Sequence, residues 1–208
     1  MTTQKTKNKK DFQGFTLRGK VRYSTLIEPK MWSGSQQKWV VNCVKGAYSI
    51  VLDADTPTAK EMIEKLEGLY QDAFREYSKE HKEKGKTEVL HQQKTFIQEK
   101  DGKTSLNFKR NAVNSAGDVA KIGFKDAFKK DINLQGELGT RSDVVVRFTT
   151  YFTPVVTEDK KNINFYMTLC LLDVQIITHV PYDSNDDWCV DVEEVTDVEL
   201  IGEDSIPF

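Results

Sequence analysis

The stretch "SDVVVRFTTYFTPVVTEDKKNINFYMTLCLLDVQII", residues 142–177, predicts two long β-strands joined by a turn. Both halves are rich in β-branched and aromatic residues, which favour strands, and a run of polar residues separates them. We expect strands over residues 142–156 and 162–177, with the segment "TEDKKN" closing them into a hairpin.

Strand alternation assigns the side chains of this hairpin to two faces. The core face is predicted to hold Val144, Val146, Phe148 and Phe152 on the first strand and Phe165, Met167, Leu169 and Leu171 on the second. The opposite face is predicted to hold Arg147, Thr149 and Tyr151 on the first strand and Asn164, Tyr166 and Thr168 on the second. Tyr166 should therefore lie near Tyr151 across the hairpin.

Three earlier segments also read as strands, over residues 15–27, 38–53 and 104–113. Gly46 interrupts the second of them and is expected to mark a bulge or a sharp bend. The segment "EPKMWSGSQQ", residues 28–37, is rich in turn formers and predicts a loop that carries Trp32. The pattern of residues 114–139 is ambiguous, because it fits either a short helix or a strand with a loop.

One helix is predicted over about residues 57–84, because apolar side chains recur there with the 3.6-residue period. Either Thr56 followed by Pro57, or the capping box from Thr58 to Glu61, is expected to start it, and Gly85 to end it. Its last two turns are charged on all sides, so they are predicted to project from the body or to fray.

Five long strands, one inserted helix and glycines at bends predict a mainly β fold. The predicted architecture is a five-stranded Greek-key barrel of the oligonucleotide-binding (OB) kind, and a sandwich with an accessory helix is the alternative. We expect three parts: a basic flexible arm over residues 1–14, the barrel domain over residues 15–182, and an acidic C-terminal tail over residues 183–208.

The net charge of −2 conceals a strong charge asymmetry. Residues 183–208 contain ten acidic side chains and no lysine or arginine, so that segment carries −10 and residues 1–182 carry +8. This separation favours a body that binds a polyanion and bears an acidic appendage. An acidic tail that only improves solubility is the alternative.

Basic groups alternate with aromatic rings on the predicted strands. Lysine and arginine neutralise phosphates and rings stack on any base, so this combination suits single-stranded nucleic acid without sequence preference. The predicted DNA-binding residues are Lys20, Arg22, Trp32, Trp39, Lys109, Arg110, Arg147, Tyr151 and Tyr166. Each ring could instead be a core or cross-strand packing residue.

Other chemistries find little support in the sequence. Three cysteines and three histidines have no metal-ligand spacing, and no phosphate-binding loop, nucleophile elbow or dinucleotide fingerprint is present. Asp183, Asn185, Asp187 and Glu194 match a calcium-loop template, but Trp188 stands where that loop needs glycine. We therefore predict no enzyme, no cofactor and no metal.

The sequence also predicts a cytoplasmic protein. No apolar run approaches the roughly 18 residues of a membrane span. The lysine-rich start has no apolar segment behind it, so no secretory signal is expected.

The end of the chain, "GEDSIPF", resembles the tip of bacterial single-stranded DNA-binding proteins, whose acidic tails finish in Asp-x-Ile-Pro-Phe. Asp204, Ile206, Pro207 and Phe208 match that pattern. The order of the body is similar to that of bacteriophage single-stranded DNA-binding proteins with a compact OB fold. The matching segments are "GKVRYSTLIEP", "KWVVNCV", "LNFKRNA", "KKDINLQGELGTRSDVVVRFTTYFTP" and "NINFYMTLCLLDVQII". In one departure, the helix falls between the second and third strands rather than between the third and fourth, unless Gly46 divides two strands.

The resemblance implies a protein that coats single-stranded DNA during phage replication, recombination or repair in an infected bacterial host. It implies that the tip binds replication or recombination proteins through Glu203, Asp204, Ile206, Pro207 and Phe208. Charge suggests that the acidic segment competes with DNA for a cationic groove. A homodimer is compatible with these features by analogy. The alternative is an adaptor of a replication complex that does not coat DNA.

Overall fold

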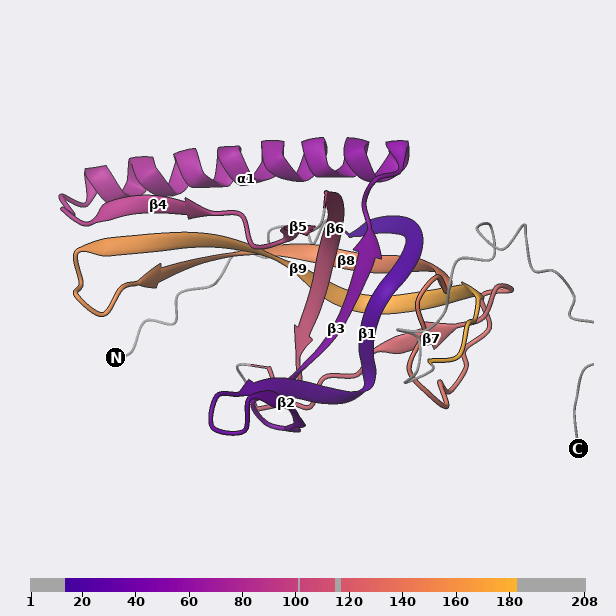
Figure 1. The fold of residues 1–208 in the computed structure, drawn as a ribbon. Helices are drawn as coiled ribbons and strands as arrows, with labels where there is room; N and C mark the ends of the chain where they lie inside the picture. Colours follow the sequence, from indigo (N-terminus) through magenta and orange to yellow (C-terminus); the bar gives the residue numbers. More distant parts are fainter. Residues whose placement is uncertain (1–13, 101, 115–116, 183–208) are drawn as a thin grey trace, which may run out of the picture.

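The computed structural model describes residues 14–100, 102–114 and 117–182 of the 208-residue chain. Within these residues the chain forms nine strands and one helix (Figure 1). In order they are β1 (Phe15–Ser33), β2 (Lys38–Val41), β3 (Ala47–Asp53), α1 (Pro57–Glu83), β4 (Val89–Gln93), β5 (Ile97–Lys100), β6 (Lys103–Asn111), β7 (Gly123–Lys125), β8 (Asp143–Val156) and β9 (Asn162–Thr178).

Five of the strands close into a barrel. β1 pairs antiparallel with β3 and with β8, β3 pairs antiparallel with β6, and β8 pairs antiparallel with β9. A short parallel contact between β6 and β9, at Phe108 with Leu169, completes the circle. The predicted mainly β, OB-like barrel with a single helix is therefore confirmed.

The core fills the barrel with side chains from all five strands. Leu17, Ile50, Leu106, Phe108, Val146, Phe148 and Leu169 are each no more than 1% exposed. The predicted alternation holds along β9, where Phe165, Met167, Leu169 and Leu171 are all buried. On β8 it holds up to Phe148, whereas Phe152 is 36% exposed and stacks on Phe165 at 6.1 Å between ring centroids.

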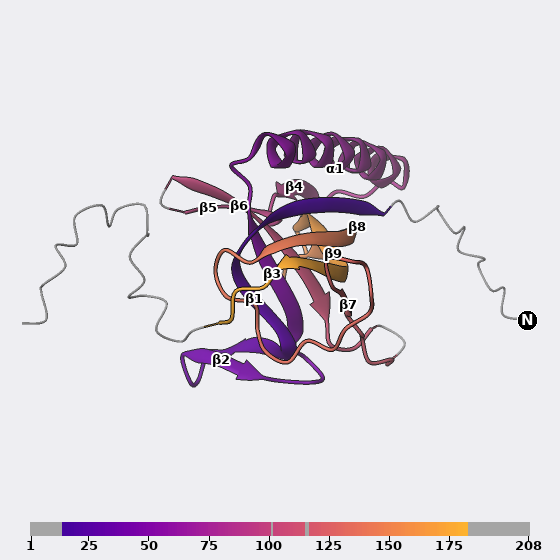
Figure 2. The ribbon, with the colours of Figure 1, turned by 90° about the vertical axis from the view of Figure 1, so that its right-hand side faces the viewer.

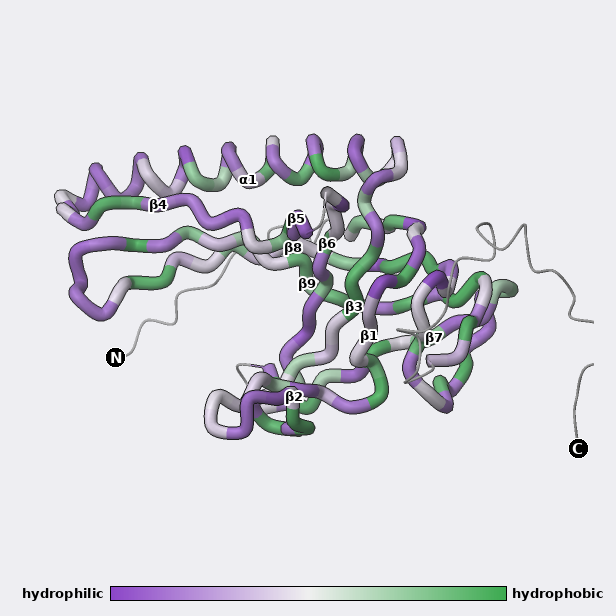
Figure 3. The backbone as a smooth tube through the Cα atoms, viewed as in Figure 1, coloured by the Kyte–Doolittle hydropathy of each residue, from purple (hydrophilic) through white to green (hydrophobic). Residues whose placement is uncertain are grey.

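Beyond the barrel, β8 and β9 continue as a long hairpin that carries α1 on one face (Figure 1). β4 joins the outer part of this hairpin by pairing parallel with β9. The ring of Phe165 contacts Tyr70, Phe74 and Tyr77 of α1, with centroid distances of 5.9, 5.6 and 5.1 Å. Figure 3 shows the hydrophobic residues of α1 on the side that faces the sheet.

The end of α1 was predicted wrongly. The expectation that the last two turns project or fray considered only their charged surface. In the structure Tyr77 stacks on the hairpin, and His81 is 5% exposed with its Nε2 3.2 Å from the Glu88 carbonyl oxygen. The start and end agree with the prediction: the Thr56 hydroxyl accepts from the Ala59 amide, Pro57 is the first helical residue, and Gly85 follows with a φ of +64°.

The strands before the helix differ from the prediction in two places. The expected second strand over residues 38–53 is two strands, β2 and β3, divided by a tight turn over residues 42–46. A Cβ at Gly46 would collide with the Asn42 carbonyl oxygen, so glycine is required there. β1 runs on to Ser33 through the segment predicted as a loop, and β2 pairs with this extension.

The position of the helix agrees with the expected departure from the standard order. α1 lies between β3 and β6, the second and third strands of the barrel. β4 and β5 were not predicted, and β7 falls in the stretch whose pattern was ambiguous.

The Tyr70 hydroxyl joins three elements and provides a test of this packing. It donates to the Phe165 carbonyl oxygen of β9 at 2.5 Å and accepts from the Gln93 amide of β4 at 2.6 Å. Tyr70→Phe should lower the free energy of unfolding by about 1–3 kcal/mol, because both buried groups lose this partner. Urea denaturation measures the change.

Tyr77→Phe is the matched control, since the Tyr77 hydroxyl makes no hydrogen bond within the described residues. Its unfolding free energy should stay within about 0.5 kcal/mol of wild type. If Tyr70→Phe and Tyr77→Phe lowered the free energy of unfolding equally, the stabilising role assigned to the Tyr70 hydroxyl would be contradicted.

Candidate functional site

The outer part of the β8–β9 hairpin has a second face that α1 does not cover. Cross-strand pairing places Tyr151 opposite Thr168 and Thr153 opposite Tyr166 on this face. β4 adds His91 and Gln93, and the Gln93 side-chain amide donates to Asn164 Oδ1 at 3.3 Å. We call the side chains of Tyr151, Thr153, Val155, Asn164, Tyr166, Thr168, His91 and Gln93 the open hairpin face. It combines rings with polar side chains that can form hydrogen bonds.

Tyr151 and Tyr166 are diagonal neighbours on the open hairpin face, as predicted. Tyr151 is 46% exposed and Tyr166 is half-buried. Burial, with a smaller contribution from the nearby Cys170, raises the pKa of the Tyr151 phenol, and the Arg110 guanidinium opposes that rise. The phenol is therefore neutral at physiological pH and presents an uncharged ring.

β6 brings two cations to the base of the open hairpin face. Lys109 is exposed and pairs with Cys170 of β9 in the parallel ladder. The Arg110 guanidinium donates to the Leu171 carbonyl oxygen at 3.4 Å and acts on the pKa values of both Tyr151 and Cys170. Three predicted site residues, Lys109, Arg110 and Tyr151, therefore lie near one another where β6, β8 and β9 meet, and Tyr166 lies further out on the hairpin, diagonal to Tyr151.

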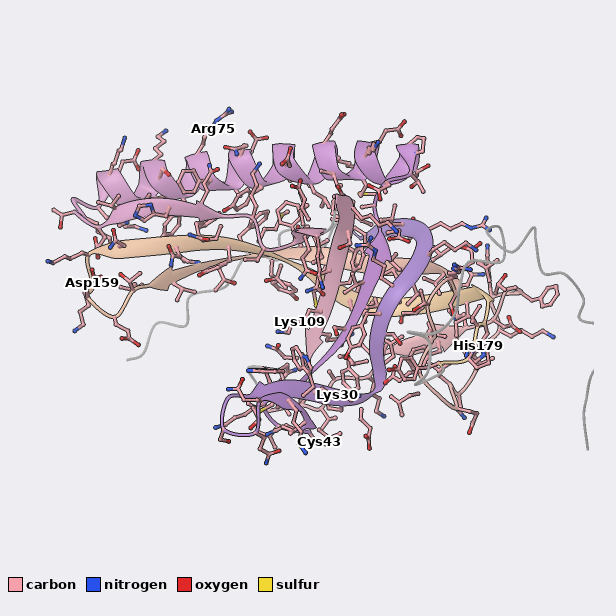
Figure 4. The ribbon with its side chains drawn as sticks, in the orientation of Figure 1. Lys30, Cys43, Arg75, Lys109, Asp159 and His179 are labelled. Atoms are coloured by element: carbon pink, nitrogen blue, oxygen red, sulfur yellow. The ribbon has the colours of Figure 1, made fainter. Side chains whose placement is uncertain are left out.

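β2 and the end of β1 form an arm that projects on the same side of the barrel as the hairpin (Figure 1). Figure 2, a view at right angles, shows α1 above the barrel and this arm below it. Lys109 lies between hairpin and arm, and Lys30 lies on the arm (Figure 4). The arm over residues 27–46 carries Lys30, Lys38 and Lys45 against a single acid, Glu28.

Trp32 and Trp39 lie opposite each other on this arm, not in a loop. Their ring centroids are 5.8 Å apart in an edge-to-face arrangement, and the residues are 49% and 56% exposed. Each ring therefore buries part of its surface against the other ring. The remaining surface is exposed to solvent, on the same side of the barrel as the tyrosines of the open hairpin face.

Glu137 fixes the root of the arm. Its carboxylate accepts from the backbone amides of Leu26 and Ile27, at 2.6 and 2.9 Å, and from the Ser24 hydroxyl at 3.0 Å. The register of β1 against β3 shifts between Thr25 and Lys30, so these amides lie where the strand departs from regular pairing. Glu137 belongs to the stretch whose pattern was ambiguous, and no local signal in the sequence indicates this long-range role.

The remaining predicted cations lie elsewhere, each beside a carboxylate. Lys20 Nζ is 3.7 Å from Asp143, while Arg22 pairs with Asp53 and Arg147 with Asp173. The three lie along the seam of β1 with its neighbours β3 and β8. On β8, the buried Thr149 separates Arg147 from Tyr151, so the structure does not join these cations to Lys109.

The positive charges along the seam of β1 are partly neutralised by the carboxylates beside them. Arg18 makes two hydrogen bonds to Asp143, at 3.1 and 2.8 Å, and this pairing lowers the pKa of the Asp143 carboxyl. Sequence reasoning missed these pairs because they depend on strand register.

The predicted tip residues Glu203, Asp204, Ile206, Pro207 and Phe208 lie outside the described residues. Among the residues that are described, no group of three or more histidine, cysteine or acidic side chains could hold a metal ion. In that same part of the chain, no helix has the length and apolarity needed to cross a membrane.

No protein-family model and no curated protein matches the sequence. The fold is similar to the crystal structure of gp2.5, a single-stranded DNA-binding protein encoded by bacteriophage T7. The TM-score is 0.62 at 17% identity, over 90% of this chain and 98% of that chain. The single-stranded DNA-binding protein of bacteriophage Enc34 in complex with single-stranded DNA also matches, with a TM-score of 0.45 at 16% identity over 81% of this chain and 89% of that one. The likeness to the T7 protein shows that the two chains share a fold.

The Glu137 contacts predict a specific effect on the arm. Glu137→Gln removes the charge and offers a donor where an acceptor is needed, so the amides of Leu26 and Ile27 should exchange with solvent at least about tenfold faster. Hydrogen exchange followed by mass spectrometry or NMR measures this.

Glu28→Gln is the control, because Glu28 is exposed on the same arm and makes no hydrogen bond within the described residues. Unchanged exchange at Leu26 and Ile27 in the Glu137 variant would show that the carboxylate does not hold the arm.

Proposed function

We propose that this protein binds single-stranded DNA without sequence preference, on the side of the barrel from which the hairpin and the β1–β2 arm project. The observation that carries the proposal is that Lys109 and Arg110 lie near Tyr151 at the base of the open hairpin face, with Tyr166 diagonal to Tyr151 further along it. The fold shared with the T7 single-stranded DNA-binding protein supports the same conclusion.

Each part of the proposed interface has a chemical role. Lys109 and Arg110 neutralise phosphates, which gives affinity that depends on salt. Tyr151 and Tyr166 stack on bases, at about 1–3 kcal/mol for each stacked base. The amides of Asn164 and Gln93 lie beside these rings and can bond to base edges without favouring one base strongly.

The tryptophans of the arm extend the proposed interface. Trp32 and Trp39 each keep about half of their surface open, and the arm that carries them has an excess of lysine. Lys20, Arg22 and Arg147 remain predicted DNA contacts of smaller effect, because a phosphate would have to replace a carboxylate partner at each of them.

The wider role follows from the sequence. We propose that the protein serves phage DNA replication, recombination or repair in the cytoplasm of an infected bacterium. Residues 15–182 would form the binding domain. Residues 1–14 would form a basic flexible arm at the N-terminus, distinct from the β1–β2 arm. The acidic residues 183–208 would compete with DNA, while the tip at residues 203–208 recruits partner enzymes. A homodimer belongs to the same proposal by analogy.

A salt titration with a dT oligonucleotide tests the phosphate contact. Wild-type affinity should fall steeply with salt, and in Lys109→Ala the slope of log affinity against log salt should be shallower by about 0.7, the value for one phosphate contact. Lys82→Ala on α1 is the matched control and should leave the slope unchanged, because Lys82 lies on the helix, away from the open hairpin face.

Ring contacts are tested in the same titration. Tyr151→Ala should weaken binding by about 1–3 kcal/mol without changing the salt slope. Tryptophan fluorescence should be quenched on binding, and less so in Trp32→Phe and Trp39→Phe. Absence of salt-dependent binding and of quenching in the wild type would refute DNA coating and favour the adaptor.

A further inference from the structure

A second surface lies on the side of the barrel away from the hairpin and the arm, where β7 pairs with β9 (Figure 1). Residues 131–135 follow β7 in the chain and pack beside it: Asp131 forms a bridge with Lys125, and the Ile132 amide donates to the Phe124 carbonyl oxygen at 3.0 Å. Burial alternates along this segment, because Ile132 and Leu134 pack against the core while Asn133 is exposed. We call residues 132–135 the ridge.

The ridge has an unpaired backbone edge. Within the described residues, the backbone amides of Asn133, Leu134 and Gln135 donate no hydrogen bond. Unpaired strand edges of this kind accept an added strand, which gains main-chain hydrogen bonds and places alternate side chains in pockets.

Apolar hollows lie on both sides of the ridge. One, of about 560 Å³, is lined on its far side by Ile27, Tyr48, Val119 and Phe124. The other, of about 410 Å³, lies against Ile176, Ile177, His179 and Phe128. Both contain Ile132 and Leu134 in their walls, so the ridge separates them.

Phe128 is an exposed aromatic side chain held on a rigid turn. It is 83% exposed, yet the Asp126 side chain accepts from the amides of Phe128 and Lys130, each at 2.9 Å. The Gln175 amide also bonds to the Asp126 and Ala127 carbonyl oxygens, at 3.2 and 3.3 Å. Because the backbone of this turn is already ordered, a partner that covers the ring loses little backbone entropy there.

The rim of this surface carries four lysines, Lys121, Lys125, Lys129 and Lys130, and two aspartates, Asp126 and Asp131. Lys121, Lys129 and Lys130 are exposed and make no ion pair within the described residues, whereas Lys125 pairs with Asp131. An occupant should therefore be an extended peptide with apolar side chains at alternate positions and an excess of carboxylates.

This chain contains such a peptide. In "WCVDVEEVTDVEL", residues 188–200, Trp188, Val190, Val192, Val198 and Leu200 share one parity, and acidic residues predominate on the other. The chain leaves the described part beside the ridge, since Pro181 forms an antiparallel bridge with Leu138 and His179 lines the second hollow. His179 is labelled near β7 in Figure 4. Five residues, 183–187, span up to about 17 Å, enough to turn back along the ridge.

We propose that residues 188–192 of this chain add to the ridge as an antiparallel strand. Val190 and Val192 lie against Leu134 and Ile132 and fill the hollow beside Ile176 and Ile177, on the edge of the ridge that faces away from β7. Cys189 and Asp191 lie on the side of Gln135 and Asn133. The carboxylates that follow reach the basic rim. In this docked state the acidic segment lies away from the proposed DNA-binding side. It is an alternative to the state in which the same segment competes with DNA, and residues 201–208 extend beyond the anchor. This docking does not depend on DNA binding.

Hydrogen exchange on the full chain tests the docking. The amides of Asn133 and Gln135, which point away from β7, should exchange at least about tenfold more slowly in the wild type than in the double variant Val190→Ser, Val192→Ser. Val195→Ser, of the opposite parity, is the matched control and should keep the protection. The amide of Phe108 in β6 reports that the barrel is intact in every variant. Unprotected amides at Asn133 and Gln135 in the wild type would overturn the proposal.

Disulfide trapping identifies the occupant. In a Cys43→Ser background, Gln135→Cys should form a disulfide with the native Cys189 under mild oxidation, at the mass of a single chain. Thr140→Cys, which is exposed but off the ridge, should form it at least about tenfold more slowly, and Cys189→Ser should abolish it. A disulfide found mainly between two chains would show that the segment docked on the ridge belongs to a second copy of the chain, and it would overturn the proposal.

Discussion

The length of β9 is the constraint on which the rest of the structure depends. Its 17 residues make it longer than one strand of the barrel wall, so different parts of it pair with different elements. β8 accompanies it along almost its full length, β6 closes the barrel at its middle, β4 pairs with its first half and β7 with its second. Because the apolar side chains of its first half leave the barrel, α1 has to cover them, and the ring of Phe165 makes that contact. The uncovered face of the same segment becomes the open hairpin face.

Much of this arrangement could be predicted because its signals are local. The alternation in β8 and β9, the apolar period of α1 and the glycine at 46 each depend on neighbouring residues only. β4 could not be predicted in this way, since "VLHQQ" alternates weakly and becomes a strand by pairing with β9. The extension of β1 was hidden by Pro29 and by the turn formers that follow Trp32. Tertiary pairing outweighs local preference at these sites.

The predicted site residues divide in the same way, into those placed by local signals and those whose partners depend on tertiary pairing. Tyr151 and Tyr166 could be placed together because hairpin register follows from the turn, whereas the partners of Lys20, Arg22 and Arg147 depend on which strands meet. Each of those cations lies beside an acid, and exposed pairs of this kind contribute little to stability. Their main effect is to reduce the positive potential along the β1 seam. The excess of positive charge that remains on the described body is therefore concentrated around β6, the β1–β2 arm and the turn at Lys129.

The place of β9 in the barrel also governs how the polypeptide matures. β1, β3 and β6 are synthesised early, but the barrel cannot close until residues 162–178 have left the ribosome, because β9 joins β6 to β8. Its contacts with β4 and β6 span about 60 to 75 residues of chain, and such distant pairings slow folding. Until then the apolar faces of three finished strands stay open to aggregation during translation. In a cell that makes the protein rapidly, we expect the yield of folded protein to depend on the supply of chaperones as well as on final stability.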